Sequence, residues 1–330
     1  MNKIILDIKN LVVTYTTQKG ITGLTQTVHA INGVNLSVNK GEILSIAGES
    51  GCGKSTLAKS VMKLIPVKSG EIIFEDKDII NIKSKSDLRN FYKNVQIIFQ
   101  NPYSSLNPKM KIGEILAEPL KINTSKNQKE IQQIIEDKIS QVGLDKNILK
   151  LYPHEFSGGQ RQRIAIARAL ILDPKLIIAD EPVSALDVSI QAQIINLLKS
   201  LKENLNLTFL FISHDLSVIR YISDRIAVMY LGEIVEIGST EEIFSTPKHP
   251  YTQALISAVP KFSTQNIQNN DFPPKLNGEL PSAQNLPKGC KFHTRCPFAM
   301  DICKKSSPLE NEFSQTHKCK CFLYDENCVI

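Results

Sequence analysis

A short stretch near the start of the chain has the residue types and spacing of a phosphate-binding loop. It reads Gly48-Glu49-Ser50-Gly51-Cys52-Gly53-Lys54-Ser55-Thr56. The glycines would let successive backbone N–H groups point at phosphate oxygens where a Cβ would clash. Lys54 is expected to reach the β- and γ-phosphates, and the Ser55 hydroxyl is expected to bind Mg²⁺. The alternative is a glycine-rich turn with an incidental lysine. Nucleotide binding is the stronger interpretation, although the loop alone does not identify the kind of NTPase.

A pair of acids follows the apolar run Leu176–Ala179, which predicts a buried strand. Asp180 is expected to join the Mg²⁺ shell, and Glu181 is expected to polarise a water for attack on the γ-phosphate. The alternative is an ordinary strand capped by exposed acids. That alternative is weaker in a chain that also carries a phosphate loop.

A second glycine-containing motif, Ser157-Gly158-Gly159-Gln160, precedes a helical pattern rich in Ile and Ala. Ser157 is a good N-cap, and the glycines leave backbone N–H groups approachable, so the motif predicts a second anion site. The alternative is a plain capped helix. Arg161 and Arg163 then lie at the positive end of the helix dipole, where cations are disfavoured, and a bound external anion would offset them.

Strands and helices alternate around these motifs, which predicts an α/β protein with a parallel sheet. We place a first domain at residues 1–260, with a helical insertion at about 101–174, and a second at 261–330. Periodicity predicts helices and strands at the ranges given at the end of this paragraph. A hairpin is predicted at 225–238 with its turn at Leu231-Gly232, and 101–119 is expected to be loop-rich with a short helix near its end. The predicted strands are 4–15, 28–38, 42–47, 70–75, 95–100, 175–179 and 208–213, and the predicted helices are 54–64, 84–95, 128–142, 158–172, 189–204, 215–222, 240–245 and 250–258.

Composition narrows the class of protein further. The 330 residues are 42% hydrophobic and 22% charged with a net charge of +6, as in an ordinary soluble protein. No apolar run is long enough to span a membrane, and the charged N-terminus does not resemble a secretory signal, so a cytosolic location is expected. Six of the seven cysteines lie after residue 289, and in a reducing compartment such clustering favours a metal site over disulfides.

Taken in order, the phosphate loop, Ser157–Gln160, Asp180-Glu181, Ser184-Ala-Leu-Asp187 and His214 resemble the ATP-binding cassette (ABC) ATPases. The resemblance implies a RecA-like parallel sheet with an antiparallel β subdomain and a helical insertion, here followed by a small irregular Cys-rich C-terminal extension. It also implies that ATP is sandwiched between the phosphate loop of one cassette and the Ser157–Gln160 segment of another. By the same resemblance, the remaining site residues would be Tyr15 stacking on adenine, Gln100 sensing Mg²⁺ and the γ-phosphate, Glu181 as general base, His214 holding the γ-phosphate and Asp187 at the dimer seam.

Two positions depart from the usual pattern. Phe156 stands before Ser157 where the family commonly has Leu, an apolar exchange that we expect to be neutral. Cys52 lies inside the phosphate loop, where Lys54 and a helix N-terminus would lower its thiol pKa and make it a target of alkylating agents. The alternative for Cys52 is a small residue that the loop simply tolerates.

The segment Pro247-Lys-His-Pro-Tyr-Thr-Gln-Ala-Leu-Ile-Ser-Ala-Val-Pro260, with the cysteine-bearing tail after it, resembles the ATPases of oligopeptide and dipeptide importers. The segments 181–189 and 152–156 resemble the second, F-type, of their two paired ATPases. This implies a D-type ATPase as heterodimer mate, two transmembrane permease subunits and an extracytoplasmic peptide-binding protein. The chain would then act at the cytoplasmic face of the cell membrane as a peripheral subunit.

The tail cysteines have wide and uneven spacing: five residues lie between Cys290 and Cys296, and six lie between Cys296 and Cys303. Paired zinc ligands usually have two to four residues between them. Four thiolates at such spacing with a Cys-Pro step suit an iron–sulfur cluster better, and the resemblance implies a [4Fe–4S] cluster. Zinc and free thiols remain alternatives. The candidate ligands are Cys290, Cys296, Cys303 and Cys321, with Cys319 hard to separate from Cys321.

Two further hypotheses compete with peptide import. One is a cassette ATPase that acts on nucleic acid or the ribosome, although the chain has a single cassette and its tail lacks interleaved aromatic and basic residues, so no nucleic acid is expected. The other is an importer ATPase for nickel or another small solute, because the substrate is chosen by other subunits.

Overall fold

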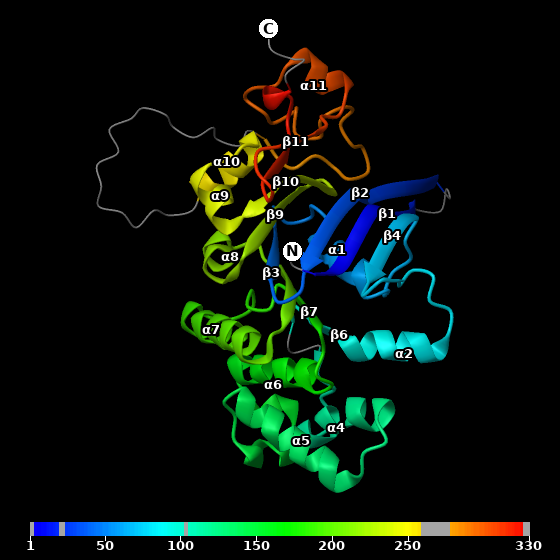
Figure 1. The fold of residues 1–330 in the computed structure, drawn as a ribbon, viewed down its shortest axis with the longest axis vertical. Helices are drawn as coiled ribbons and strands as arrows, with labels where there is room; N and C mark the ends of the chain where they lie inside the picture. The colour runs from blue at the N-terminus through cyan, green and yellow to red at the C-terminus, as the bar shows by residue number, and fades with distance from the viewer. Residues whose placement is uncertain (1–2, 20–23, 102–104, 259–277, 326–330) are drawn as a thin grey trace, which may run out of the picture. The chain divides into compact units, whose positions relative to one another are not determined.

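The computed structural model describes residues 3–19, 24–101, 105–258 and 278–325 (Figure 1). Contacts divide the chain into two compact units. The first consists mainly of Ile73–Ser213, and the second of Asp7–Ser37, Leu44–Ile72 and the residues from His214 onward. The domain boundary predicted at residue 260 lies outside the described residues.

In the first unit, three parallel strands lie in the order β8-β7-β6. Ile178 in the middle strand pairs with Ile97 on one side and Leu210 on the other. All five residues of β7 and of β8 are buried, as expected for parallel strands covered on both faces. The elements of this unit are β5 (Lys77–Asp78), α2 (Lys85–Asn94), β6 (Val95–Ile98), α4 (Ile112–Asn123), α5 (Gln128–Gln141), η1 (Lys146–Lys150), η2 (Pro153–Glu155), α6 (Gly158–Leu170), β7 (Leu176–Asp180), α7 (Val188–Leu205) and β8 (Thr208–Ile212).

Helix α4 is longer than the sequence predicts. The region was expected to be loop-rich to residue 119, but the helix covers twelve residues and contains Pro119. A proline in a helix interior costs about 3 kcal/mol because it removes a hydrogen bond and crowds the preceding turn. The apolar side chains of Ile112, Ile115, Leu116 and Leu120 are all buried, and their burial outweighs that cost.

In the second unit, five strands lie in the order β11-β12-β10-β9-β3, with β3 parallel to β9. A further sheet contains β2, β1 and β4 in that order. The predicted hairpin is present, and its two turn residues Leu231 (φ 43°) and Gly232 (φ 79°) have the left-handed conformations that a tight hairpin needs. The elements are β1 (Ile4–Lys19), β2 (Leu24–Asn39), β3 (Ile43–Ala47), α1 (Lys54–Val61), β4 (Ser69–Phe74), α8 (Leu216–Ile222), β9 (Arg225–Tyr230), β10 (Glu233–Ser239), α9 (Thr240–Ser245), α10 (Pro250–Ser257), α11 (Asp301–Lys305), β11 (Glu310–Glu312), β12 (Lys318–Lys320) and η3 (Phe322–Tyr324).

The described part of the C-terminal tail is only partly irregular, which corrects the sequence prediction. Strand β12 joins the sheet by antiparallel pairing with β10, with Glu236 opposite Cys319. Three residues of strand are too short to give a periodic signal in the sequence. The tail also supplies Phe292, whose fully buried ring lies 5.2 Å from Tyr230 and 5.5 Å from Tyr251 between ring centroids. Within the described residues, no helix combines the length and apolarity that a membrane crossing requires.

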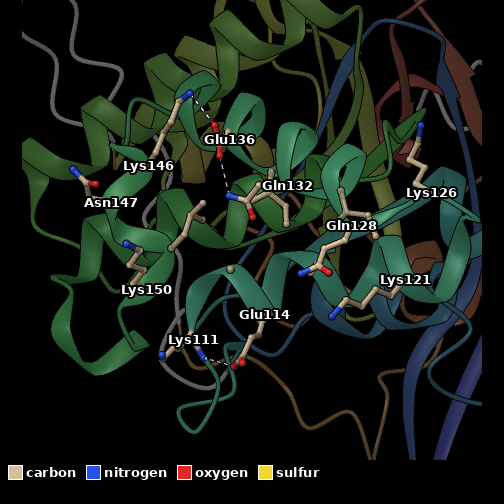
Figure 2. A pocket seen from close by; sticks show the side chains of 15 residues that line it. Lys111, Glu114, Lys121, Lys126, Gln128, Gln132, Glu136, Lys146, Asn147 and Lys150 are labelled. Atoms are coloured by element: carbon tan, nitrogen blue, oxygen red, sulfur yellow. Dashed lines mark hydrogen bonds and ion pairs between the residues drawn. The ribbon is translucent and has the colours of Figure 1, made fainter.

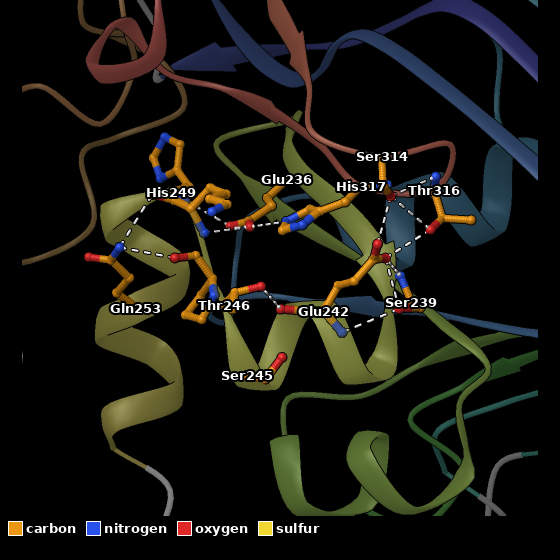
Figure 3. A network of polar contacts seen from close by, with 12 residues as sticks. Glu236, Ser239, Glu242, Ser245, Thr246, His249, Gln253, Ser314, Thr316 and His317 are labelled. Atoms are coloured by element: carbon orange, nitrogen blue, oxygen red, sulfur yellow. Dashed lines mark hydrogen bonds and ion pairs between the residues drawn. The ribbon is translucent and has the colours of Figure 1, made fainter.

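Two carboxylates of β10 and α9 hold the tail in place (Figure 3). Glu236 is buried, and its oxygens accept hydrogen bonds from the backbone N–H groups of Lys248 (2.7 Å) and His249 (2.9 Å) and contact His317 Nε2 at 2.7 Å. Glu242 accepts hydrogen bonds from the hydroxyls of Ser314 (2.6 Å) and Thr316 (2.8 Å). Both carboxylates therefore join the tail segment before β12 to the rest of the second unit.

Candidate nucleotide site

The phosphate loop follows β3 and leads into α1, as its sequence predicts. Its three glycines have positive φ angles: 152° at Gly48, 83° at Gly51 and 114° at Gly53. A Cβ on Gly48 would lie 2.3 Å from the Met229 carbonyl oxygen, and one on Gly53 would lie 2.5 Å from that of Ala30. Only glycine fits these two positions, and the backbone is left free to surround an anion at the helix N-terminus.

Lys54 is buried, and its ammonium group donates hydrogen bonds to the carbonyl oxygens of Gly48 (2.7 Å) and Glu49 (2.9 Å). These loop carbonyls are the acceptors that phosphate oxygens would replace or share when a nucleotide binds. The Tyr15 hydroxyl lies 3.5 Å from the Thr56 hydroxyl oxygen, so the predicted adenine-stacking residue is next to the loop.

The predicted catalytic acids lie in the first unit, at the carboxyl end of β7. Asp180 is buried, and Glu181 has a left-handed backbone conformation (φ 47°) with its N–H bonded to the Ile212 carbonyl at 2.9 Å. Gln100 donates from Nε2 to Glu181 Oε2 at 2.9 Å. The structure thus brings together two residues that the sequence predicts to handle water and Mg²⁺. His214 belongs to the second unit and has an exposed side chain.

The Ser157–Gln160 motif forms a capping box at the start of α6. The Ser157 hydroxyl accepts from the Gln160 N–H (3.4 Å), and Gln160 Oε1 accepts from the Ser157 N–H (3.1 Å). Both side chains are exposed. A Cβ on Gly159 would lie 2.6 Å from Ile190 Cγ2 of α7, so close packing requires glycine there. The motif is therefore closely packed on one side and accessible at a helix N-terminus.

The two arginines after this motif have carbonyl acceptors within this chain, and the second anion site at Ser157–Gln160 stays a prediction. Arg163 donates to the Val142 carbonyl at 2.7 Å, and Arg161 donates to the His154 carbonyl at 3.3 Å. Val142 is the C-cap of α5, where the partial negative charge of a helix C-terminus favours a cation. Within the first unit, carbonyl groups thus offset the unfavourable position of both guanidinium groups.

An exposed surface lies at the start of α7. Asp187 is the N-cap residue and makes no side-chain capping bond, and Val188 after it is 82% exposed. Asp187, which the resemblance places at a dimer seam, is therefore exposed to solvent in this chain.

Cys52 does not have the reactive thiol considered above. Its side chain is buried, and burial raises its pKa more strongly than the nearby Lys54 lowers it. The hypothesis of a lowered pKa is therefore wrong, and Cys52 fits the alternative of a small residue packed inside the loop.

Four tail cysteines line one small cavity: Cys290, Cys296, Cys303 and Cys321. Burial raises the pKa of Cys290 to about 11 and that of Cys321 to about 12. Cys319 does not line this cavity; burial also raises its pKa, and the Glu236 carboxylate raises it further. Among the residues that the structure describes, no group of three or more His, Cys, Asp or Glu side chains is arranged to hold a metal ion, so the predicted cluster is not confirmed.

Two residues near the phosphate loop escaped the sequence prediction. Tyr251 of α10 accepts a hydrogen bond on its hydroxyl from the Glu49 N–H at 2.9 Å. Arg295 of the tail forms an ion pair with the Glu49 carboxylate, with 3.1 Å between Nη1 and Oε2. In the sequence, Tyr251 belongs to the segment Pro247–Pro260 that resembles the importer ATPases, and Arg295 directly precedes the candidate ligand Cys296. Neither signal indicates a contact with the phosphate loop.

The phosphate loop, the acid pair after β7 and the glycine-containing N-terminus of α6 together define a P-loop ATPase of the cassette type. Residues 31–184 match the family described as ABC transporter, and residues 235–303 match the one described as Oligopeptide/dipeptide transporter, C-terminal region. The oligopeptide transport ATP-binding protein AppF of Bacillus subtilis is 50% identical over 297 residues, which cover 90% of each chain. OppF of Salmonella typhimurium is 47% identical over 322 residues, which cover 96% of each chain. The chain belongs to the ABC transporter ATPases, in the branch of the oligopeptide and dipeptide transport ATP-binding proteins.

Solved structures agree with this assignment. A dimeric structure of the ATP-binding cassette MJ0796, bound to ADP and Pi, is 29% identical with a TM-score of 0.63 and covers 72% of this chain and 99% of that one. CbiO1 from Clostridium perfringens, part of an ABC transporter complex, is 27% identical with a TM-score of 0.63. The match covers 74% of this chain and 92% of CbiO1. These relatives confirm the predicted mixed α/β cassette fold and the ATPase activity, but they do not confirm the Cys-rich extension.

Proposed function

We propose that this chain hydrolyses ATP to drive import of oligopeptides or dipeptides through partner membrane permeases. The observation that carries the proposal is the union of a complete set of cassette motifs with a C-terminal region of the oligopeptide/dipeptide transporter type. The transport proteins named above support a peptide substrate over nickel or another small solute.

Each chemical step of ATP hydrolysis has a candidate residue in this chain. The phosphate loop and Lys54 bind the β- and γ-phosphates, and Tyr15 stacks on adenine. By the family resemblance, Ser55, Gln100 and Asp180 would hold Mg²⁺, which would neutralise charge that develops on the phosphate oxygens. Glu181 would accept the proton of the attacking water, and the hydrogen bond from Gln100 Nε2 holds its carboxylate beside Gln100. His214 contacts the γ-phosphate.

We propose a second cassette subunit of the D type as partner. The Ser157–Gln160 motif and Asp187 are exposed in this chain, and each would contact ATP bound to the partner's phosphate loop. ATP binding would close the pair, and hydrolysis with product release would reopen it. An extracytoplasmic peptide-binding protein would deliver the substrate, which would place this chain at the cytoplasmic face of the membrane.

The membrane subunits would contact residues 101–119, which follow Gln100 directly. A pocket of about 740 Å³ supports this location, because α4 forms one wall and α5 and η1 form the others (Figure 2). Five lysines and two glutamates line the pocket, and Lys146 is already paired with Glu136 at 2.9 Å. The other lysines would accept an acidic segment of a permease; they are Lys111, Lys121, Lys126 and Lys150. A photo-crosslinking amino acid in place of Lys111 should capture a permease, whereas one in place of exposed Lys93 on α2 should not.

We also propose that the cavity lined by Cys290, Cys296, Cys303 and Cys321 holds a [4Fe–4S] cluster of structural role. The shared cavity supports Cys321 over Cys319 as the fourth ligand. Anaerobic purification followed by a visible spectrum and iron and sulfide analysis tests it. About four iron atoms per chain are expected; stoichiometric zinc, or no metal at all, would contradict the cluster.

Affinity purification of the tagged chain from detergent-solubilised cells tests the transport function. We expect two permease subunits and a second cassette ATPase to co-purify. Recovery of RNA or ribosomal proteins in their place would favour the alternative class and remove the transport proposal.

A further inference from the structure

Glu49 places a negative charge inside a loop whose task is to bind anions. The Glu49 side chain is 25% exposed, and its Oε2 accepts a hydrogen bond from Arg295 Nη1 at 3.1 Å. Its other oxygen, Oε1, is buried and has no hydrogen-bond partner among the residues that the structure describes. An uncompensated carboxylate here would repel the phosphates of ATP, so the charge on Arg295 bears directly on nucleotide binding.

Arg295 is buried, and aromatic side chains around it hold its guanidinium group in place. Its side chain is 6% exposed, and its guanidinium carbon lies 5.9 Å from the centroid of the Tyr230 ring. Tyr230 packs edge-to-face on Tyr251 with ring centroids 4.7 Å apart, and the Tyr251 hydroxyl accepts the Glu49 N–H. The side chain and the backbone of Glu49 are therefore both fixed from the C-terminal part of the chain.

A second segment of the tail also lies against the phosphate-binding elements. The Ala283 carbonyl accepts a hydrogen bond from the His29 N–H of β2 at 2.9 Å. Leu280 Cδ2 lies 3.9 Å from where a Cβ of Gly51 would be. The contact of Arg295 with the loop thus belongs to a wider docking of residues 280–295 onto the nucleotide-binding elements of the second unit.

We infer that Arg295 is a positioning residue for ATP binding: it neutralises Glu49 and so keeps the phosphate loop able to accept triphosphate. The inference rests on nucleotide binding by this loop. It makes the Cys-rich segment part of the ATP-binding apparatus, since Arg295 directly precedes Cys296.

Coulomb's law gives the size of the expected effect. A carboxylate and one phosphate charge about 8 Å apart in an effective dielectric of about 40 repel by about 1 kcal/mol, and the triphosphate carries several charges. Loss of the Arg295 charge should therefore weaken ATP binding by about tenfold, which corresponds to about 1.4 kcal/mol. The loss should shrink at high salt because the repulsion is screened.

The test measures the Kd of a fluorescent ATP analogue for the purified full-length chain at about 0.05 M and 0.5 M salt. Arg295→Met should raise the Kd about tenfold at low salt, and Arg295→Lys by less than about threefold. Glu49→Gln should bind at least as tightly as the parent, because it removes the repelling charge. The double variant Arg295→Met with Glu49→Gln should return to within about twofold of the parent.

Lys318→Met provides the matched control. Lys318 lies in the same tail and forms an ion pair with Glu312 at 2.6 Å, so the control removes one positive charge without touching the loop. Its Kd should stay at the parental value. Thermal unfolding of every variant separates affinity from stability.

Three results would overturn the inference: an unchanged Kd in Arg295→Met, a double variant as weak as Arg295→Met, or an equal loss in the control. Failure of the parent chain itself to bind the analogue would instead contradict nucleotide binding.

Discussion

Replacing Glu181 with Gln is the sharpest test of the catalytic site. The exchange keeps the shape of the side chain and removes its charge and basicity. Glu181 Oε2 accepts a hydrogen bond from Gln100 Nε2 at 2.9 Å, and an amide oxygen can accept the same bond. The stability of the first unit should therefore change by less than about 1 kcal/mol.

The effect on hydrolysis should be far larger. A positioned general base contributes about 10²–10⁴-fold to rate, which is about 3–5.5 kcal/mol in the activation barrier. We expect ATP turnover to fall by at least about 100-fold while the Kd for ATP changes by less than about twofold.

The assay is phosphate release by the assembled transporter at saturating ATP, with equilibrium binding of a fluorescent analogue measured on the same samples. Glu203→Gln is the control, because Glu203 is an exposed acid on α7 away from the acid pair, and its variant should retain parental turnover. Turnover above about one tenth of the parental rate in Glu181→Gln would refute the assignment of Glu181 as base.

Further predictions concern the tail and the loop cysteine. His317→Leu leaves the buried Glu236 carboxylate with only its backbone donors, so the free energy of unfolding in urea should fall by about 3 kcal/mol; an unchanged value would contradict a role for this pair. Partial burial opposes ionisation of Glu242, but hydrogen bonds from hydroxyl groups and a backbone N–H outweigh it and lower its pKa to about 2. Its stabilisation of about 1–2 kcal/mol is therefore complete above pH 4.5 and is lost as pH falls toward 2. In the Glu242→Gln variant the free energy of unfolding should change less with pH between 4.5 and 2 than it does in the parent. The same pH dependence in variant and parent would contradict this. Cys52 should react with iodoacetamide at less than about one tenth of the rate of a free thiol; rapid labelling blocked by ATP would show that burial does not protect it.

The sequence predicted those parts of the site that are local in the chain. The glycines of the phosphate loop, the Ser157 cap with Gln160 three residues later and the Leu231-Gly232 turn each carry their geometry in a few adjacent residues. Pairings over long separations had no such signal. Arg295 and Glu49 are 246 residues apart, and nothing in either segment indicates that they meet.

Tertiary packing also overrode local preference in three places. Helix α4 continues through Pro119 because its apolar face is buried. Arg163 lies at the unfavourable end of the α6 dipole, and the C-terminus of α5 supplies an acceptor for it. Cys52 was considered a low-pKa thiol from its neighbours in sequence, but its burial determines the direction of the shift. In each case the contacts that determine the outcome come from residues distant in the sequence, so a local sequence pattern does not predict them.

The most direct test of the proposed function is uptake of a labelled oligopeptide into vesicles that contain the permeases and both ATPase subunits. We expect uptake in the presence of ATP and the peptide-binding protein, and none when this chain is omitted or carries Glu181→Gln. Uptake that continues at the full rate without this chain, or with the variant, would contradict its role as the ATPase that drives peptide import.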